Sequence, residues 1–426
     1  MKKQKISGIG LCLAALLISH VGCQSMKSQE ETTDETAATI LPDWQAGYLD
    51  IHQISTGRGN AAFLILPDGT TMLIDAGDLG VSRGPQEIMQ PMPNDSLRPA
   101  EWIVRYITHF SAPLKNGGAI DYALMTHFDN DHIGDNGPLA VEKEGLDYKL
   151  TGISHVANLL PIHKLIDRDY PNYTYPNEQH FAKEHVKNYL RFVAARDAEG
   201  VPTEGFQVGS NEQFRLLKDA GAYPNFEIRN LVGNGKLWTG AGEAFREIVP
   251  ADAPTDLFLN ENRCSCGIRI TYGDFDYFSG GDIQAEDKNK PEWFDIETSV
   301  GQLLGETDVV VANHHAYSDA MFPPYVAAVK PQAFILPVWD FYHPQPTSLN
   351  NMLSKELYPG ERMVFAAGLV GSNRTRLGAE GEQIKPAGHV VLRVYPGGEQ
   401  FQFFVLDDHS LDYPIIYQTE KLTANP

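Results

Sequence analysis

The sequence predicts an α/β fold, and three observations lead to that prediction. Short apolar runs that suit buried strands alternate with segments of helical spacing along most of the chain. Two of these runs, residues 61–66 and 71–75, flank a turn at residues 67–70 and predict a hairpin. The chain has 426 residues, of which 42% are hydrophobic, so it can bury a large core. We therefore expect one α/β domain over residues 41–426.

The elements at the start of this domain can be assigned in order. Residues 48–54 alternate apolar and polar side chains, which predicts a strand before the hairpin. Residues 99–109 have helical spacing, with the apolar side chains on one face. The apolar run at residues 122–125 is short enough for a buried strand, and it leads directly into a polar loop at residues 126–135.

The middle of the chain is less regular. Between residues 136 and 259 we expect helices near residues 180–196 and 211–220 and interpret the region as an insertion. Regular patterns then return and predict strands for the remainder. These are a tight hairpin around Gly273, strands at residues 307–312 and 333–338, and a closing hairpin of residues 389–395 and 400–406.

The loop at residues 126–135 has the most distinctive composition, with two histidines and three carboxylates in ten residues. Such crowding brings no structural gain, but a divalent metal turns mutual repulsion into attraction, since imidazole and carboxylate are its preferred ligands. His127 and Asp129 lie two apart and can share one ion. Asp131 and His132 can face a second ion, and Asp131 is the predicted catalytic residue.

Two later segments carry further candidate ligands. Asp282 follows two glycines at the end of a predicted strand and is free to bridge both ions. His314 and His315 follow another strand, and we expect at least one of them, preferably His315, to complete the second site. Two ions held in this way would bind a hydroxide between them and supply a nucleophile near neutral pH.

The loop pattern H-x-D-x-D-H, preceded by a strand and followed by Ile133-Gly134, resembles the metallo-β-lactamase superfamily, in particular the ComEC-like branch found in a competence DNA-uptake protein. The resemblance covers most of residues 48–345 and implies an αββα sandwich that holds two divalent ions, zinc or manganese. The other motifs in the same order are Gly57-Arg58-Gly59-Asn60-Ala61, Pro67-Asp68-Gly69, Leu73-Ile74-Asp75-Ala76-Gly77, Asn260-Glu261-Asn262, Gly280-Gly281-Asp282 and His314-His315.

The chain departs from the superfamily pattern at its ligands. Asp129 replaces a histidine, which gives the first site a carboxylate oxygen, a harder donor than an imidazole nitrogen. Manganese therefore competes with zinc as the bound ion. The superfamily also contributes a histidine between the loop and the bridging aspartate, and no histidine in that interval has the usual glycine-flanked context. This ligand is therefore not assigned. The histidines in the interval are His155, His163, His180 and His185.

Five further residues are candidates for roles around the ions. The resemblance implies that Asp75 supports the ligand loop from behind, although it could simply cap the hairpin. Arg58 and Asn60 lie in a glycine-flanked loop, either solvated or in contact with substrate. Tyr317 is a candidate pocket residue, in a segment that differs from the competence branch, and His343 is either a pocket residue or part of a turn.

The N-terminus predicts export to the cell envelope. Residues 1–23 combine three early lysines, an apolar stretch too short to span a bilayer and a small-residue site before Cys23, which resembles a lipoprotein signal peptide. Residues 24–40 are polar and acidic and predict a flexible tether. We expect a lipid anchor on Cys23, facing the periplasm or the exterior, as the sole membrane attachment.

Composition narrows the functional classes. The net charge of −21 disfavours non-specific nucleic-acid binding, which needs a basic surface. The leading hypothesis is a metal-dependent hydrolase of phosphoester or phosphodiester substrates, including small molecules. The alternatives are a lactone, ester or amide hydrolase of the same fold, or a ligand-binding surface lipoprotein with a degenerate site.

Overall fold

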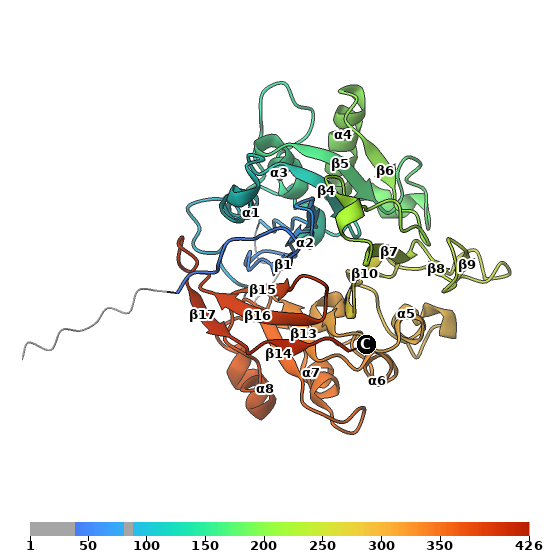
Figure 1. Cartoon of the computed structure of the whole chain (residues 1–426). Helices are drawn as coiled ribbons and strands as arrows, with labels where there is room; N and C mark the ends of the chain where they lie inside the picture. The colour runs from blue at the N-terminus through green and yellow to red at the C-terminus, as the bar shows by residue number, and fades with distance from the viewer. Residues whose placement is uncertain (1–38, 81–87, 426) are drawn as a thin grey trace, which may run out of the picture. The chain divides into compact units, whose positions relative to one another are not determined.

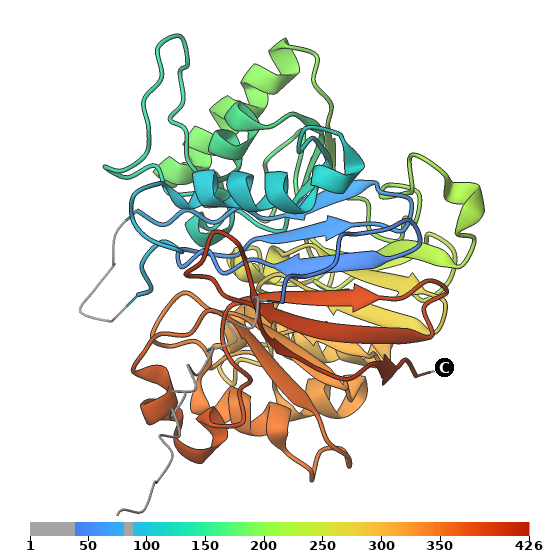
Figure 2. The ribbon, with the colours of Figure 1, turned by 60° about the vertical axis from the view of Figure 1, so that its left-hand side comes forward.

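Two β-sheets face each other in the computed structural model, which describes residues 39–80 and 88–425. Helices cover the outer face of each sheet, so the layers run helix, sheet, sheet, helix (Figure 1 and Figure 2). This arrangement confirms the predicted αββα sandwich. The predictions for residues 1–23 and for nearly all of the tether fall outside the described residues.

The first sheet has ten strands among the described residues, in the order β17-β16-β15-β1-β2-β3-β4-β5-β6, with β18 beside β16. Strands β3 to β6 run parallel, and the other neighbours are antiparallel. The strands are β1 (Leu49–Gln53), β2 (Ala62–Ile65), β3 (Thr71–Ile74), β4 (Ile120–Met125), β5 (Ile162–Asp167), β6 (Thr203–Gly205), β15 (His389–Val394), β16 (Gln400–Leu406), β17 (Ile415–Gln418) and β18 (Leu422–Thr423).

The second sheet has eight strands in the described part of the chain, in the order β14-β13-β12-β11-β10-β7-β8-β9. Strands β11 to β14 are parallel, whereas β10, β7, β8 and β9 pair in antiparallel fashion. The strands are β7 (Phe226–Gly233), β8 (Lys236–Trp238), β9 (Phe245–Glu247), β10 (Gly267–Tyr272), β11 (Phe275–Ser279), β12 (Val309–Val311), β13 (Ala333–Pro337) and β14 (Met363–Ala367).

Helices pack against the outer faces through apolar side chains. The first sheet is covered by α1 (Pro99–Phe110), α3 (Gly152–Leu159) and α4 (Glu184–Ala198). The second is covered by α5 (Ile296–Leu304), α6 (Pro323–Val329), α7 (Pro346–Leu353) and α8 (Asn373–Gly381). The short helix α2 (Asn130–Ile133) lies within the ligand loop. The predicted helix at residues 99–109 is confirmed as α1, with its apolar stripe buried.

The strands read as continuous apolar runs because both faces of each sheet are covered. In β2, Leu64 faces the core between the sheets, whereas Phe63 packs under the helices of the first layer. In β13, Ile335 likewise faces the central core, whereas Phe334 packs against the helices of the other layer. Successive side chains point to opposite faces of a strand, so each apolar strand packs in the core between the sheets on one face and against the helices on the other.

One predicted helix is wrong. Residues 211–220 form no helix, and only their end enters a short 3-10 turn at Ala220–Ala222. The main chain here bonds to the β2–β3 turn instead: the amide of Leu217 donates to Thr70 Oγ1 at 2.9 Å, and that of Lys218 donates to Asp68 at 2.7 Å. The irregular region as a whole supplies β5 and β6 to the first sheet and β7, β8 and β9 to the second.

The topology gathers the chemically interesting loops at one edge. Parallel strands all point their carboxyl ends the same way. The ligand loop follows β4, Asp282 follows β11, and the His314-His315 pair follows β12. These loops meet where the two sheets adjoin, and the sandwich thus brings together segments that are up to about 190 residues apart in the chain.

Across the described ranges, no helix is both long enough and apolar enough to cross a bilayer.

A buried ion pair joins two neighbouring interior strands of the first sheet. Asp50 of β1 lies opposite Arg393 of β15, and the guanidinium donates to both carboxylate oxygens at 2.8 and 2.6 Å. Both residues are almost fully buried. A buried carboxylate left without its partner costs far more than an exposed one.

We expect Arg393→Ala to lower the free energy of unfolding by about 3–5 kcal/mol, because it leaves the buried carboxylate of Asp50 without its ion-pair partner. Lys330→Ala is the matched control. It breaks a 2.7 Å ion pair with Glu306 whose side chains are 42% and 63% exposed, and such surface pairs contribute about 0–1 kcal/mol. Urea unfolding followed by circular dichroism measures both, and equal losses in the two variants would contradict the prediction.

Candidate metal centre

The hairpin near the N-terminus of the domain clamps the main chain of the ligand loop. The amide of Asn60 donates to the carbonyl of Asp131, and the amide of Ala76 donates to that of His132, both at 2.8 Å. Gly77 makes this approach possible, because a Cβ at that position would lie 2.0 Å from the oxygen of Asp131. The glycine-rich motifs of this hairpin therefore serve to hold the loop.

Asp75 anchors the same loop from behind through its side chain. Its carboxylate accepts hydrogen bonds from the amide and the hydroxyl of Thr126, both at 2.8 Å, and from Asn60 Nδ2 at 2.9 Å. It also faces His132 Nδ1 at 2.7 Å. The position matches the supporting role that the sequence predicted, and Asn60 belongs to this support.

A second buried acid holds the loop from its other side. Glu261 accepts hydrogen bonds from the amide of Phe128 and, through both oxygens, from Arg168, all at 2.8 Å. His180 Nδ1 lies 3.0 Å from the same carboxylate. Burial raises the pKa of Glu261, but the charge of Arg168 and the hydrogen bonds from His180 and Arg168 together outweigh it and leave the pKa below its usual value. Sequence reasoning found the motif around Glu261 and gave this acid no role.

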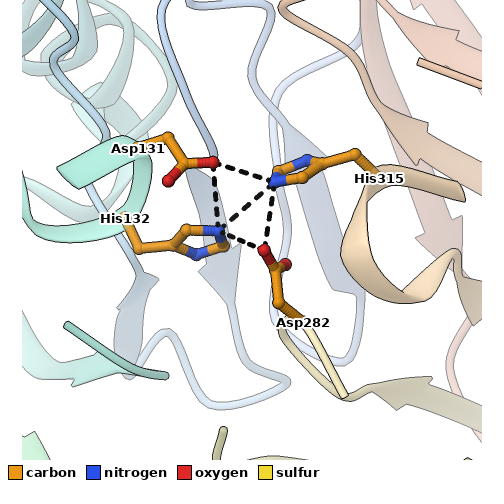
Figure 3. A group of neighbouring side chains, drawn as sticks. All are labelled: Asp131, His132, Asp282 and His315. Atoms are coloured by element: carbon orange, nitrogen blue, oxygen red, sulfur yellow. Dashed lines mark hydrogen bonds and ion pairs between the residues drawn. The ribbon is translucent and has the colours of Figure 1, made fainter. Parts of the chain in front are cut away.

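Four buried side chains converge at the edge of the sandwich: Asp131, His132, Asp282 and His315 (Figure 3). His315 Nε2 lies 3.2 Å from Asp131 Oδ2 and 3.5 Å from Asp282 Oδ2. His132 Nε2 lies 3.7 Å from Asp131 Oδ2 and 3.3 Å from Asp282 Oδ2, and the two Nε2 atoms are 3.3 Å apart. The structure thus brings together ligands predicted from three separate motifs.

The hydrogen bonds of the two imidazoles show which nitrogen faces the centre as an acceptor. His315 Nδ1 lies 2.7 Å from the main-chain oxygen of Pro337, which can only accept, so Nδ1 carries the proton. His132 Nδ1 donates to Asp75 in the same way. In the neutral imidazoles both Nε2 atoms therefore bear lone pairs and face each other beside two carboxylates. Such a cluster requires a cation or additional protons at its centre.

The spacing of these donors fits a metal ion. Protein donors lie roughly 2.0–2.2 Å from tetrahedral zinc, so neighbouring donors around one ion are about 3.3–3.6 Å apart. The five separations given above range from 3.2 to 3.7 Å. Two imidazole nitrogens and two carboxylates are also a donor set that divalent zinc and manganese accept. The residues therefore fit the ion that the sequence predicted.

The neighbouring carboxylates raise the pKa values of the two histidines in this cluster. Burial lowers the pKa of His315, but Asp282 and Asp131 outweigh it and raise the pKa to about 9. Burial also lowers the pKa of His132, and Asp282, Asp75 and Asp131 raise it well above the usual value. In other words, the site attracts positive charge strongly, and a divalent ion can take the place of these protons.

A second group of candidate ligands, His127 and Asp129, also lies near Asp282. His127 Nε2 is 3.9 Å from Asp129 Oδ2 and 3.7 Å from Asp282 Oδ2. This nitrogen is fully buried and has no hydrogen-bond partner among the described residues. Burial and the neighbouring His132 lower the pKa of His127. Asp129 is held by Lys183, whose Nζ lies 2.8 Å from Oδ1. Asp282 Oδ2 thus faces both groups, as a bridging ligand must.

Of the adjacent histidines, both face Asp282. His315 Nε2 is 3.5 Å and His314 Nε2 is 3.9 Å from Asp282 Oδ2. The preferred residue, His315, lies in the four-residue cluster, and His314 lies beside it with its Nδ1 2.6 Å from Asp319 Oδ1. The aspartate five residues after His314 was not singled out in the sequence.

A cavity of about 230 Å³ opens above the centre. Tyr317 and His343 line it, and the His343 ring stacks on that of His315 with centroids 4.7 Å apart. Sequence reasoning missed three other wall residues that follow β13, because nothing in their local pattern marks them. The residues that line the cavity are Asp129, Asp131, Asn262, Asp282, His314, Tyr317, Trp339, Asp340, Tyr342 and His343.

The structure corrects the predictions for the glycine-flanked loop. Arg58 and Asn60 are both buried, so the solvated-loop alternative is wrong. Asn60 bonds to Asp75 and does not line the cavity, which removes its predicted substrate contact. Arg58 does not line the cavity either, and its charge lies near those of Arg98 and Asp78. These residues were misjudged because exposure depends on what packs over a loop.

The histidines between the loop and Asp282 have other surroundings. His180 faces Glu261, and His185 Nε2 lies 3.1 Å from the main-chain oxygen of Phe128. His163 is exposed on β5. His155 is buried on α3, near the charges of Glu101 and Arg98. None of the four lines the cavity above the centre.

Several solved structures are distantly similar to this chain. No protein-family model and no curated protein matches the chain. Among solved structures, isothiocyanate hydrolase from Delia radicum gut bacteria has 14% identity and a TM-score of 0.34, with 79% of this chain and 94% of that chain covered. The short form of human tRNase Z has 10% identity and a TM-score of 0.28, with 67% and 91% covered. Zinc-bound PqqB from Methylobacterium extorquens has 9% identity and a TM-score of 0.30, with 67% and 88% covered.

We expect Asp75→Ala to weaken divalent-metal binding by about 10–100-fold, because residues that orient a metal-binding histidine typically contribute that much. The reason is that His132 loses the acceptor that fixes its Nδ1 proton. Titration with zinc against a competing chelator measures the affinity. Asp252→Ala, which removes an exposed aspartate, is the control, and equal affinity in the two variants would contradict the supporting role of Asp75.

Proposed function

We propose that this protein is a metal-dependent hydrolase whose active site is the cluster around Asp282. One observation carries the proposal: the Nε2 atoms of His132 and His315, both acceptors when neutral, lie 3.3 Å apart between two buried carboxylates. Divalent ions bound by such donors ionise water near neutral pH and polarise a substrate oxygen. The proposed first group of ligands is His127 and Asp129, and the second is Asp131, His132 and His315.

The residues around this site have defined tasks in the proposal. Asp75 and the oxygen of Pro337 keep the protons of His132 and His315 on Nδ1, which turns their Nε2 lone pairs inward. Asp282 Oδ2 faces both groups and so holds them at a fixed separation. The aromatic rings of Tyr317 and Trp339 flank the cavity and can pack against an apolar part of a substrate.

We propose phosphoesters or phosphodiesters as the leading substrate class, because paired ions suit displacement at phosphorus. The cavity of about 230 Å³ is smaller than a pocket for a drug-sized ligand, roughly 300–1,000 Å³, and so favours a small substrate. The overall charge of −21 also opposes a large polyanion such as nucleic acid.

A second candidate class is uncharged esters, lactones or amides. The described residues that line the cavity include four aspartates, and neither lysine nor arginine is among them. An anionic substrate would therefore depend on the bound ions alone for its attraction, whereas a neutral one needs no such compensation. The charges that line the cavity therefore support uncharged esters, lactones or amides as a second substrate class to be tested.

We expect Asp131→Ala and Asp282→Ala to reduce hydrolysis of bis(p-nitrophenyl) phosphate to background while the protein stays folded. Each variant removes a carboxylate from the proposed ions, and a thermal melt by circular dichroism checks folding. Asp252→Ala serves again as the exposed control. The wild type should lose activity on chelation and regain it with zinc or manganese, so activity that survives thorough chelation would defeat the proposal.

A parallel screen separates the substrate classes. p-Nitrophenyl phosphate, bis(p-nitrophenyl) phosphate, a nucleotide, p-nitrophenyl acetate and a lactone are offered to the same metal-loaded protein. Turnover of the acetate or lactone alone would replace the phosphoester class by the carbonyl class. Fewer than one ion per chain after purification without chelators, with no turnover, would favour a ligand-binding protein instead.

We also propose that the protein is exported and anchored to the cell envelope by a lipid on Cys23. The signal-like N-terminus and the polar tether that follows support this proposal. We expect Cys23→Ser to abolish incorporation of an alkyne-labelled fatty acid during expression in bacteria and to release the protein from the membrane fraction. Equal labelling of the wild type and the variant would contradict it.

A further inference from the structure

The first group of ligands is one donor short. In the proposed arrangement His127, Asp129 and the bridging Asp282 supply three donors to the first ion, whereas the second group, whose donor atoms all lie within 4.8 Å of one another, has four with Asp282 included. The Nε2 atom of His127 is buried and has no hydrogen-bond partner among the described residues, so it is available to bind a cation. Among the described residues, His314 is a further histidine with a nitrogen 3.9 Å from Asp282 Oδ2, whereas neither His180 nor His185 lines the cavity above the centre.

We propose that His314 supplies this fourth donor, so that the adjacent histidines His314 and His315 bind one ion each, and that Asp319 positions His314. The inference rests on the proposed metal-dependent function and assigns the ligand that the sequence left open. His314 Nε2 lies 3.9 Å from Asp282 Oδ2, wider than the spacing of about 3.3–3.6 Å around one tetrahedral zinc ion but similar to the 3.7 and 3.9 Å that separate His127 Nε2 from Asp282 and Asp129.

The hydrogen bonds of His314 prepare its Nε2 as a donor to metal. Its Nδ1 lies 2.6 Å from Asp319 Oδ1, so the carboxylate fixes the proton on Nδ1. The other oxygen of Asp319 accepts from Gln284 Nε2 at 2.7 Å, which holds the carboxylate in place. The arrangement repeats that of His132 with Asp75. Sites that bind metal through histidine commonly contain such a carboxylate partner.

The backbone around the pair is bent in the way that two converging rings require. His314, His315 and Ala316 have φ angles of +46°, +53° and +56°. The left-handed region is unfavourable for residues with a side chain and occurs mostly where the surroundings impose it. In this conformation both imidazoles reach one oxygen of Asp282.

Glu297 holds this turn in place from α5. Its buried carboxylate accepts hydrogen bonds from Asn313 Nδ2 at 2.9 Å and from the amides of Met321 and Phe322 at 2.7 and 3.0 Å. The two ends of the loop that carries His314 and Asp319 are therefore tied to one group. Such support is needed to maintain three consecutive residues in a strained conformation.

With His314 included, the two groups become equivalent in composition. Each offers two imidazole Nε2 atoms and one carboxylate of its own, and shares Asp282. The first group uses Asp129 and the second Asp131 as that carboxylate. A site with matched donor sets accepts two ions of the same kind, because neither position is softer than the other.

A purely structural role for His314 is the alternative. Asn262 Nδ2 lies 3.0 Å from His314 Nε2 and donates to it, which could simply close a hydrogen-bonded chain from Asn262 to Asp319. In that case the histidine would not contribute to ion binding. A second alternative is a rearrangement that turns His180 toward the first group. Metal stoichiometry distinguishes all three.

The test counts ions by mass spectrometry after equilibration with zinc at a free concentration that saturates the wild type. We expect two ions per chain in the wild type and one in His314→Gln. Asp319→Asn should retain the ligand but weaken one of the two ions by about 10–100-fold. The absorption spectrum of the cobalt-substituted protein should lose one component in His314→Gln and a different one in His315→Gln.

His409→Gln, which changes an exposed histidine beside Asp408, is the matched control and should keep two ions. His180→Gln tests the rearrangement, and we expect it to keep two ions as well. Two ions bound with wild-type affinity in His314→Gln would overturn the proposal in favour of the structural role. Loss of one ion in His180→Gln would overturn it in favour of the rearrangement. If His314→Gln fails to fold, unchanged zinc affinity in Asp319→Asn overturns the positioning role. Fewer than one ion in the wild type would instead defeat the proposed function.

Discussion

Two imidazole nitrogens and two carboxylates are held at one point with no lysine or arginine among the described residues that line the cavity, and the rest of the site follows from this constraint. The Nε2 atoms of His132 and His315 face each other across 3.3 Å, and the carboxylates of Asp131 and Asp282 face them both. Folding must bring these groups out of water, and that is costly unless positive charge accompanies them. A cation bound at this point, as we propose, would therefore link the stability of this edge of the sandwich to metal binding.

The surroundings of the centre are rigid because convergence of this kind needs support. Asp75 and the oxygen of Pro337 fix two imidazoles, Asp319 fixes a third, and Glu261 fixes the loop from its other side. Most of these groups are buried, so the hydrogen bonds they make are difficult to exchange for water. The glycines near the loop serve the same end, since they let main chains approach where a side chain would collide.

Much of the fold was predictable from the sequence, for physical reasons. Strands such as β2, β4 and β13 were recognised because burial on both faces demands continuous apolar runs. The helix α1 was recognised from its single apolar stripe. Residues 211–220 misled because their amides bond to Asp68 and Thr70 far away in the chain, and local spacing cannot reveal such partners.

By itself, the sequence determined the α/β class and singled out the loop, the aspartate and the histidine pair that the structure brings together, whereas the αββα layering was implied by the family resemblance. These features are local, since a run of apolar residues or a crowd of acids is visible within ten positions. Only the tertiary structure decided that Asn60 supports Asp75, that Trp339 and Asp340 line the cavity, and that Asp319 holds His314. Those roles arise from contacts between segments far apart in the chain or from the exact bend of one turn, and neither is encoded in residue spacing.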